Sequence, residues 1–472
     1  MIRILLATPP ETEKLEIYKV LGVKAPPLGL AWIGAVLEEH GYRVRILDST
    51  TLGLNVKDFM NEVKTWHPDI VGISAITPTV NKAYEAVRYL KEYDKNIPVI
   101  MGGPHVTFMY VEALNHNVDI VVRGEGEYTI LELVQTLERH GFNFEKLKRV
   151  KGIAFKCNDK IIVTKDREVI KNLDELPYPA RHLLPMDKYT FLHKPIKIIH
   201  VMASRGCPYG CTFCSSSYFW GRYVRFRSPK NVVDEIEECI NKYKTNIVVF
   251  TDDELTLSRK FIEDLIKELK IRKLDIQYTC GARVDHVDAE LLKKIYDSGC
   301  VSLYFGVESG SQETLNRIGK KISLDQVRKV FSWIKKLKKE AVATFMLGFP
   351  WETLQDMKLT IKFAVKLNPT FAQFTIVTPY PGTPLFKQAS KEGLIEDWNW
   401  DNWTTLKPVM RGYFFNRLQV KRMLTLAYLK FYGRASFIFR ELIKGRIPFI
   451  ITFFKNSVLP WIERKLFMRD RL

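Results

Sequence analysis

A regular alternation of short apolar runs with amphipathic stretches is the feature that most constrains how this 472-residue chain can fold. In residues 1–140, five apolar runs predict strands, and stretches with helical periodicity separate them. The predicted strands are Ile2–Ala7, Tyr42–Leu47, Ile70–Ser74, Pro98–Met101 and Asp119–Arg123. Because buried strands joined by helices form parallel sheets covered on both faces, we predict an α/β, Rossmann-like, doubly wound parallel sheet.

A second series of the same kind follows a proline-rich linker. Residues 141–195 contain a predicted hairpin around Asn158-Asp159 and then prolines that interrupt any regular element. Six further strands are predicted at Ile198–Met202, Ile247–Phe250, Ile276–Cys280, Ser302–Phe305, Ala343–Met346 and Phe374–Val377. Six β/α units match a partial (β/α)6 barrel better than a second open sheet. The predicted domains are therefore 1–140, the linker 141–195, the barrel 196–400 and a helical region 401–472.

The formal net charge of +19 is distributed unevenly. Residues 1–140 carry 14 Lys and Arg against 18 Asp and Glu, whereas residues 409–472 carry 14 against 3. A local surplus favours a local anionic surface over a nucleic acid, so we expect no nucleic-acid partner. We find no secretion signal and no run of roughly 20 apolar residues, and therefore expect a cytoplasmic protein.

Three of the seven cysteines are crowded into one loop directly after the first strand of the second series. Cys207, Cys211 and Cys214 can bind three corners of a cubane iron–sulfur cluster and leave one iron open. A structural zinc site with His200 as fourth ligand is the alternative. We expect the remaining cysteines to pack as small buried apolar side chains; they are Cys157, Cys239, Cys280 and Cys300.

Ligands of doubly wound sheets bind beyond the carboxyl ends of the strands. In the first series those ends carry the candidate binding residues Ser74, Thr77, Gly102, Gly103, Pro104, His105, Gly124, Glu125 and Gly126. Glycines suit a ligand that approaches the backbone closely, but tight turns need the same glycines. The strand ends by themselves leave both interpretations open.

The C-x3-C-x2-C loop, with Phe213 before the third cysteine, resembles the signature of radical S-adenosylmethionine (SAM) enzymes. The resemblance continues in the same order through Phe250–Glu254, Gly306–Gly310, Phe345–Glu352 and Thr378–Thr383. It implies a 4Fe-4S cluster on the three cysteines, and SAM contacts from Phe213, Asp252 or Asp253, Glu308, Gly348 and Glu352. The strict Gly-Gly-Glu form of the second motif is absent, which leaves open which aspartate contacts the methionine amine. N-capping of the following helices is the alternative role of these carboxylates.

Residues 1–140 resemble the cobalamin-binding domain that precedes the radical domain in one large subgroup. The matching segments are Pro26–Trp32, Ser74–Thr77, Gly102–His105 and Asp119–Gly126. The resemblance implies cobalamin at the strand ends. It departs from the family because the D-x-H-x-x-G motif, which supplies a cobalt-ligating histidine elsewhere, is missing after the first strand. His105 is the one histidine near this edge, and it is a candidate either for the cobalt or for the nucleotide tail.

The tail is basic and rich in aromatic residues. On a helix through residues 434–444, Ile438, Phe439, Leu442 and Ile443 share one face. The opposite face carries Arg434, Arg440, Glu441 and Lys444, and only Phe437 breaks the pattern. The apolar run Ile447–Phe454 and Trp461 follow. This pattern predicts either an interfacial membrane element or a helical lid on the barrel with a solvated basic face.

Together these features predict a cobalamin-dependent radical SAM enzyme that functionalises an unactivated carbon, by C-methylation or by ring formation. The tail favours an apolar, lipid-like substrate and a peripheral position on the anionic inner face of the cell membrane. A methylase of a soluble natural product or peptide is the alternative. The resemblance also implies an electron donor such as ferredoxin or flavodoxin. A zinc-stabilised RNA-binding protein is the non-enzymatic alternative.

Overall fold

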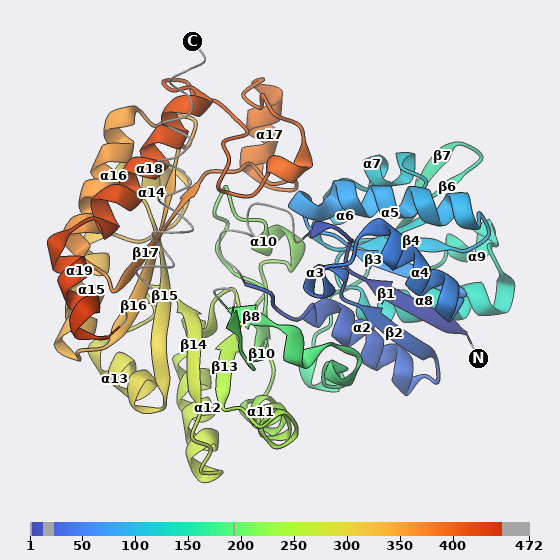
Figure 1. Cartoon of the computed structure of the whole chain (residues 1–472), viewed down its shortest axis with the longest axis horizontal. Helices are drawn as coiled ribbons and strands as arrows, with labels where there is room; N and C mark the ends of the chain where they lie inside the picture. The colour runs from blue at the N-terminus through green and yellow to red at the C-terminus, as the bar shows by residue number, and fades with distance from the viewer. Residues whose placement is uncertain (1, 13–22, 192–193, 446–472) are drawn as a thin grey trace.

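The first unit of the computed structural model is a seven-stranded sheet in the order β2-β1-β3-β4-β5-β6-β7 (Figure 1). Its parallel strands are β1 (Arg3–Ala7), β2 (Arg43–Leu47), β3 (Ile70–Ser74), β4 (Val99–Gly102) and β5 (Ile120–Val122). Side chains alternate between two cores, since Ile4 and Leu6 face one and Leu5 and Ala7 the other. The predicted doubly wound sheet is confirmed. The structure describes residues 2–12, 23–191 and 194–445.

Helices cover both faces of this sheet. One face carries α2 (Leu28–Glu39) and α8 (Glu127–His140), and the other carries α4 (Val56–Trp66) and α5 (Val80–Tyr93). Short helices α3 (Ser49–Leu52), α6 (Pro104–Phe108), α7 (Tyr110–Asn115) and α9 (Phe144–Leu147) complete the unit. The predicted hairpin, β6 (Ile153–Cys157) and β7 (Lys160–Val163), extends the sheet by antiparallel pairing with β5.

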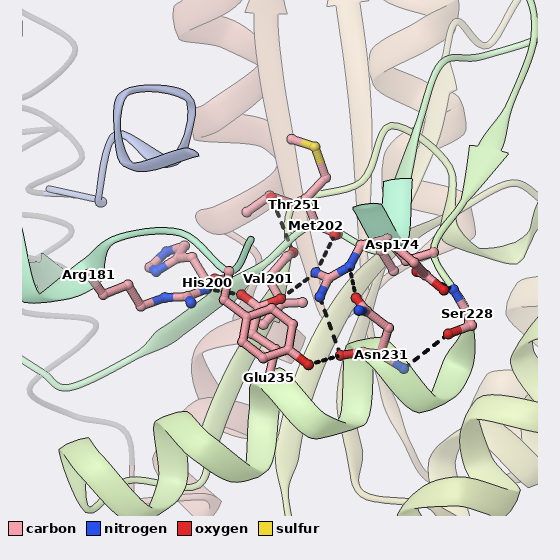
Figure 2. Close-up of polar contacts among 12 residues, drawn as sticks. Asp174, Arg181, His200, Val201, Met202, Ser228, Asn231, Glu235 and Thr251 are labelled. Atoms are coloured by element: carbon pink, nitrogen blue, oxygen red, sulfur yellow. Dashed lines mark hydrogen bonds and ion pairs between the residues drawn. The ribbon is translucent and has the colours of Figure 1, made fainter. Parts of the chain in front are cut away.

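The rest of the linker is anchored on the barrel by a buried charge network (Figure 2). Glu235 of α11 (Pro229–Tyr243) is 1% exposed and pairs with the guanidinium groups of Arg181 and Arg227. Arg181 Nη2 also donates to the carbonyl of His200, at 2.7 Å. Burial opposes ionisation of Glu235, but the two arginines lower its pKa below the usual value. The network fixes the linker against the first strand of the barrel.

The second unit is a six-stranded parallel sheet whose strands follow the chain order. They are β10 (Ile199–Val201), β13 (Ile247–Phe250), β14 (Gln277–Ala282), β15 (Cys300–Glu308), β16 (Glu340–Leu347) and β17 (Phe371–Ile376). Because β10 and β17 do not pair with each other, the barrel is partial, as predicted. Its outer helices are α11, α12 (Arg259–Ile271), α13 (Ala289–Asp297), α15 (Leu324–Lys336) and α16 (Leu354–Leu367). Each begins with a capping side chain, from Ser228, Ser258, Asp288, Ser323 and Thr353 respectively.

The C-terminal helices pack on the open side of the barrel. α18 (Arg417–Tyr432) lies against α16 and β17, in agreement with the lid interpretation. The lid interpretation predicted that the basic face of α19 (Ala435–Ile443) would be solvated, and the helix has the opposite orientation. Phe437 and Glu441 on that face are buried, whereas Phe439 and Ile443 on the apolar face are 66% and 71% exposed. The apolar run Ile447–Phe454 and Trp461 lie outside the described residues. Among the helices described, none is long and apolar enough to cross a bilayer.

Candidate functional site

The three clustered cysteines lie in a loop that a small antiparallel ladder holds at the carboxyl end of β10. β11 (Ser204–Arg205) pairs with β12 (Arg225–Phe226), and the loop from Gly206 to Cys214 lies between them. Gly206 has a φ of +101°, and a Cβ there would lie 2.2 Å from the carbonyl oxygen of Tyr223. Only glycine fits this position, directly before the first cysteine.

The thiol groups of the loop are chemically suited to an iron–sulfur cluster. Burial raises the pKa of Cys207 to about 11, and it also raises the pKa values of Cys211 and Cys214. Their negative charges would repel one another, so the thiolate forms require bound cations. Three thiolates on three irons of a cubane, with one iron open, meet that requirement.

The zinc alternative requires four side chains around one ion, with His200 as the fourth. Among the residues that the structure describes, no group of three or more His, Cys, Asp or Glu side chains is arranged around a single ion position. His200 is buried on β10, where desolvation lowers its pKa to about 4. Cys239, Cys280 and Cys300 are buried and unbridged, as expected, while Cys157 is half-buried.

The acidic residues after β13 point in different directions. Asp252 is buried, accepts hydrogen bonds from the Ala203 amide (3.1 Å) and the Ser204 hydroxyl (2.5 Å), and has a pKa raised to about 6 by desolvation. Asp253 instead accepts from the Ser216 hydroxyl at 2.7 Å, beyond the last cysteine. Its charge adds to the effect of burial in raising the pKa of Cys207. Asp252 therefore holds the strand junction, and Asp253 lies beside the cysteine loop.

A buried ion pair stands at the end of β15. Glu308, with a φ of +68°, accepts from Lys320 Nζ at 2.8 Å, and both side chains are 10% exposed. A Cβ at Gly306 would lie 2.4 Å from Glu308 Oε1 and 2.7 Å from Lys320 Nζ, so the ion pair packs directly over this glycine. Burial opposes the charge of Lys320, but Glu308 and the Cys211 thiolate raise its pKa. Sequence reasoning missed Lys320, because nothing in the pattern around it separates it from the exposed Lys321.

The loop after β16 is closed by Glu352. This fully buried carboxylate accepts hydrogen bonds from the amides of Gly348 (2.9 Å) and Phe349 (3.0 Å), and desolvation raises its pKa to about 7. The Phe213 ring packs edge-on against Phe349, with ring centroids 5.8 Å apart. Glu352 thus shapes the loop from within, while Phe213 and Phe349 form an aromatic contact between the cysteine loop and the end of β16.

The predicted cobalamin residues gather at the carboxyl edge of the first sheet. Ser74 and Gly102 are the last residues of β3 and β4, and Gly103 follows Gly102. Pro104 opens α6, and Gly124 and Gly126 flank the turn after β5. Gly103 has a φ of +103°, and a Cβ there would lie 2.7 Å from the Ala75 carbonyl oxygen. Close backbone packing therefore explains this glycine without a ligand.

His105 is 1% exposed and lies beneath the edge. Its Nδ1 lies 3.2 Å from the Thr77 hydroxyl, and its ring packs edge-on against Trp400 at 4.8 Å. Its Nε2 has no hydrogen-bond partner among the described residues and lies 3.9 Å from Glu112, which accepts from Trp400 Nε1 at 2.8 Å. The imidazole is therefore enclosed by the first sheet and by a segment from the C-terminal third of the chain.

The Glu125 carboxylate joins the two units. It accepts from Arg205 Nη1 at 3.0 Å and from Arg225 Nη1 at 2.8 Å, while Glu127 accepts from Arg205 Nη2 at 2.6 Å. The Arg205 guanidinium also lies over the rings of Trp32 (4.9 Å) and Trp220 (5.1 Å). Arg205 stands two residues before Cys207, so this cluster connects the edge of the first sheet to the cysteine loop. The sequence pattern did not reveal Arg205 or Arg225.

Comparison with protein families agrees with this division. Residues 17–134 match the B12 binding domain, and residues 201–364 match the Radical SAM superfamily. In solved structures, the fold is similar to OxsB, a cobalamin-dependent SAM radical enzyme (TM-score 0.73, 17% identity, 90% of this chain and 66% of that chain). It is also similar to TsrM, a radical SAM methyltransferase from Kitasatospora setae (TM-score 0.67, 16% identity, 84% and 76%).

Curated relatives match over most of the chain. An uncharacterized methyltransferase of Pyrococcus horikoshii is 38% identical over 94% of this chain and 95% of its own length. The anaerobic magnesium-protoporphyrin IX monomethyl ester cyclase of Rubrivivax gelatinosus is 29% identical over 95% and 81%. The hopanoid C-3 methylase of Methylococcus capsulatus is 25% identical over 81% and 72%. With the cysteine loop, the two units and this coverage in agreement, the chain belongs to the radical SAM enzymes that carry an N-terminal cobalamin-binding domain.

Proposed function

We propose that this enzyme methylates an unactivated carbon of an apolar, lipid-like substrate, using a 4Fe-4S cluster, SAM and cobalamin. Methylation is supported by the 38% identical methyltransferase, which matches 94% of this chain. When bound, the three cofactors supply one-electron cleavage of SAM and a transferable methyl group. The observation that carries the proposal is the cysteine loop at the barrel edge, facing the cobalamin-domain edge through Arg205 and Glu125.

In this proposal the residues around the cysteine loop each contact a different part of SAM. Asp253 is the acceptor for the methionine amine, because Asp252 is occupied by the strand junction. Lys320 offers the positive charge for the methionine carboxylate, which leaves Glu308 to accept from the ribose hydroxyls. Phe213 and Phe349 supply an apolar wall for the adenine, and Gly348 with Glu352 holds the loop that carries Phe349.

Cobalamin in this proposal lies across the carboxyl edge formed by Ser74, Thr77, Gly102, Gly103 and Gly124. His105 does not serve as a cobalt ligand, because its imidazole is enclosed by Thr77, Glu112 and Trp400. The carboxylate of Glu125 serves domain docking, and its backbone shapes the turn. The lower cobalt face is then free of histidine, as the missing D-x-H-x-x-G motif implies.

The lipid-like substrate is supported by the exposed apolar face of α19. Phe439, Leu442 and Ile443 lie outward, next to a tail with 14 basic residues and 3 acidic ones. Such a helix is suited to the surface of an anionic bilayer. Flotation with vesicles containing phosphatidylglycerol tests this: Phe439→Ser with Ile443→Ser should lose binding, while Ile271→Ser, which changes an exposed residue on α12, should keep it. Equal flotation of all three proteins would contradict a membrane-bound α19.

The reaction itself is tested by anaerobic incubation of reconstituted enzyme with a lipid extract and methyl-labelled SAM. Label retained in a lipid supports methylation. Ring formation is the second candidate, favoured by the cyclase relative that matches 95% of this chain. If the products are instead deoxyadenosine and an unlabelled lipid that is two hydrogens lighter, the reaction is cyclisation and not methylation.

A further inference from the structure

An exposed arginine lies directly on the outer side of the cysteine loop. A Cβ at Gly210 would lie 2.6 Å from Nη2 of Arg222, so this guanidinium rests directly on the backbone of the loop. The neighbouring Tyr223 approaches Gly206 through its carbonyl oxygen. Gly206 and Gly210 each directly precede a cysteine of the cluster motif. Residues 222–223 therefore cover the backbone that lies closest to Cys207 and Cys211.

The surface at this point is solvent-exposed and positively charged. Tyr223 is 80% exposed, and Pro208 and Arg222 are exposed as well. The turn after α14 (Gln312–Arg317) lies on the same loop, since a Cβ at Gly319 would be 3.6 Å from the Gly210 carbonyl oxygen. That turn carries the exposed Lys321.

Cations outnumber acids on this surface. Neither Arg222 nor Lys321 has an ion-pair partner among the described residues. Arg317 also contributes a charge, and its guanidinium lies over the Trp351 ring at 4.5 Å. The acid beside it is Glu313, 3.9 Å away and on the same helix. We call Pro208, Arg222, Tyr223, Arg317 and Lys321 the cluster-loop patch.

The proposed function, on which this inference rests, requires one electron to reach the cluster from outside the chain. We propose that the cluster-loop patch docks an acidic, low-potential one-electron carrier protein. The carrier loses one electron and the cluster gains it, with no atom or proton transferred. Electron-transfer complexes bury small interfaces, and complementary charge on the two partners mainly raises their association rate. A patch with exposed Pro208 and Tyr223 between cations matches such a transient partner.

The test is the rate of cluster reduction in the reconstituted holoenzyme, followed by loss of its visible absorbance after mixing with reduced flavodoxin. Arg222→Glu with Lys321→Glu should slow this reaction at least about tenfold at low ionic strength and weaken its salt dependence. Arg222→Lys should retain most of the rate. Lys230→Glu with Lys260→Glu changes the net charge equally on exposed outer helices and should react like the wild type.

Reduction by dithionite separates this inference from the proposed function. If dithionite reduces all four proteins equally, the clusters are intact and the flavodoxin rates report docking alone. Equal rates of reduction by flavodoxin for the wild type and the Arg222→Glu, Lys321→Glu variant would then overturn the proposal that the cluster-loop patch docks the carrier. Equal slowing by the outer-helix variant would overturn it too, since net charge would explain the effect. A wild-type protein without iron and acid-labile sulfide would instead refute the proposed function.

Discussion

At the scale of single residues, buried carboxylates around the site divide into paired and unpaired groups. Glu235 and Glu308 have cationic partners, whereas Glu352 and Asp252 rely on neutral hydrogen-bond donors. Desolvation therefore dominates in the second pair and raises their pKa values to about 7 and about 6. The ionised forms of these two groups oppose folding.

Glu352→Gln tests this directly. A carboxyl with a raised folded pKa contributes most to stability below its unfolded pKa of 4.5, and this contribution is lost as pH rises to about 7. The loss amounts to about 3 kcal/mol at most. We expect the melting temperature of the variant to fall less than that of the wild type between pH 5 and pH 8. The exposed Glu313→Gln serves as control, and parallel pH profiles for all three proteins would contradict the assignment.

Lys320→Met tests the ion pair at the end of β15. Removal of the cation leaves Glu308 buried without a partner and takes away the charge assigned to the methionine carboxylate. We expect SAM to bind the reconstituted variant at least about tenfold more weakly, as measured by calorimetry. Lys320→Arg should restore part of the affinity, while Lys321→Met should bind like the wild type. Unchanged SAM affinity of Lys320→Met would show that Lys320 does not bind SAM.

The neighbouring residues Asp252 and Asp253 show how far the sequence predicts the site. The alternation of apolar runs with helical stretches was enough to predict the fold. The cysteine spacing and the order of strand-end motifs indicated the family, which the comparisons confirm. The directions of Asp252 and Asp253 could not be predicted, because the β10–β11 junction, some 50 residues away, selects which one it binds. Glu125 lies at the predicted edge, but Arg205 and Arg225 from the other unit bind its carboxylate. Such long-range partners leave no local pattern.

At the scale of elements, α18 protects the exposed edge of β17. The Tyr432 hydroxyl donates to the Ala372 carbonyl (2.7 Å) and accepts from its amide (3.1 Å). The Tyr428 hydroxyl does the same at Phe374, at 3.0 Å and 3.3 Å. Two tyrosines one helical turn apart thus match two β17 residues on the same face. They replace the hydrogen bonds of a further strand where the barrel does not close.

Tyr428→Phe with Tyr432→Phe removes these bonds without creating a large cavity. Each substitution leaves a backbone donor and acceptor unpaired and should cost about 1–3 kcal/mol. We expect a lower melting temperature and faster deuterium uptake in peptides that contain β17. Tyr413→Phe, which alters a partly exposed hydroxyl bonded to Glu392, is the control. Unchanged exchange at β17 would show that α18 does not protect this edge.

Within the C-terminal helices, periodicity revealed the two faces of α19 but not their orientation. A basic face usually lies toward solvent, so the lid interpretation predicted solvated charges. Here Arg440 Nη2 donates to the Thr370 carbonyl at 2.7 Å, and Lys444 pairs with Glu340 at 2.8 Å. The ends of barrel elements offer these acceptors, and no pattern within the helix indicates them.

At the scale of the whole molecule, the cobalamin domain is held against the barrel from two sides. Arg205 binds Glu125 and Glu127 at the cysteine loop. Past the barrel strands, Asn81 Nδ2 donates to Asn399 at 2.9 Å, and Trp400 packs on His105. Segments from both ends of the barrel therefore fix the two proposed cofactor sites relative to each other.

Arg205→Met should loosen this arrangement. The substitution leaves Glu127 without its cationic partner and Glu125 with Arg225 alone, while the apolar stem can still pack on Trp32. We expect faster deuterium uptake around residues 124–127 and more deoxyadenosine formed per methylated product. Arg88→Met, which removes an exposed pair with Glu92 on α5, should change neither. A wild-type product ratio in Arg205→Met would mean that this contact does not couple the two sites.

The most direct measurement is reductant-dependent cleavage of SAM by the anaerobically reconstituted enzyme in the presence of cobalamin and a lipid extract. We expect deoxyadenosine and a methylated lipid from the wild type, and neither from a Cys211→Ala variant. A wild-type protein that carries a full 4Fe-4S cluster and yet yields no product derived from SAM would contradict the assignment.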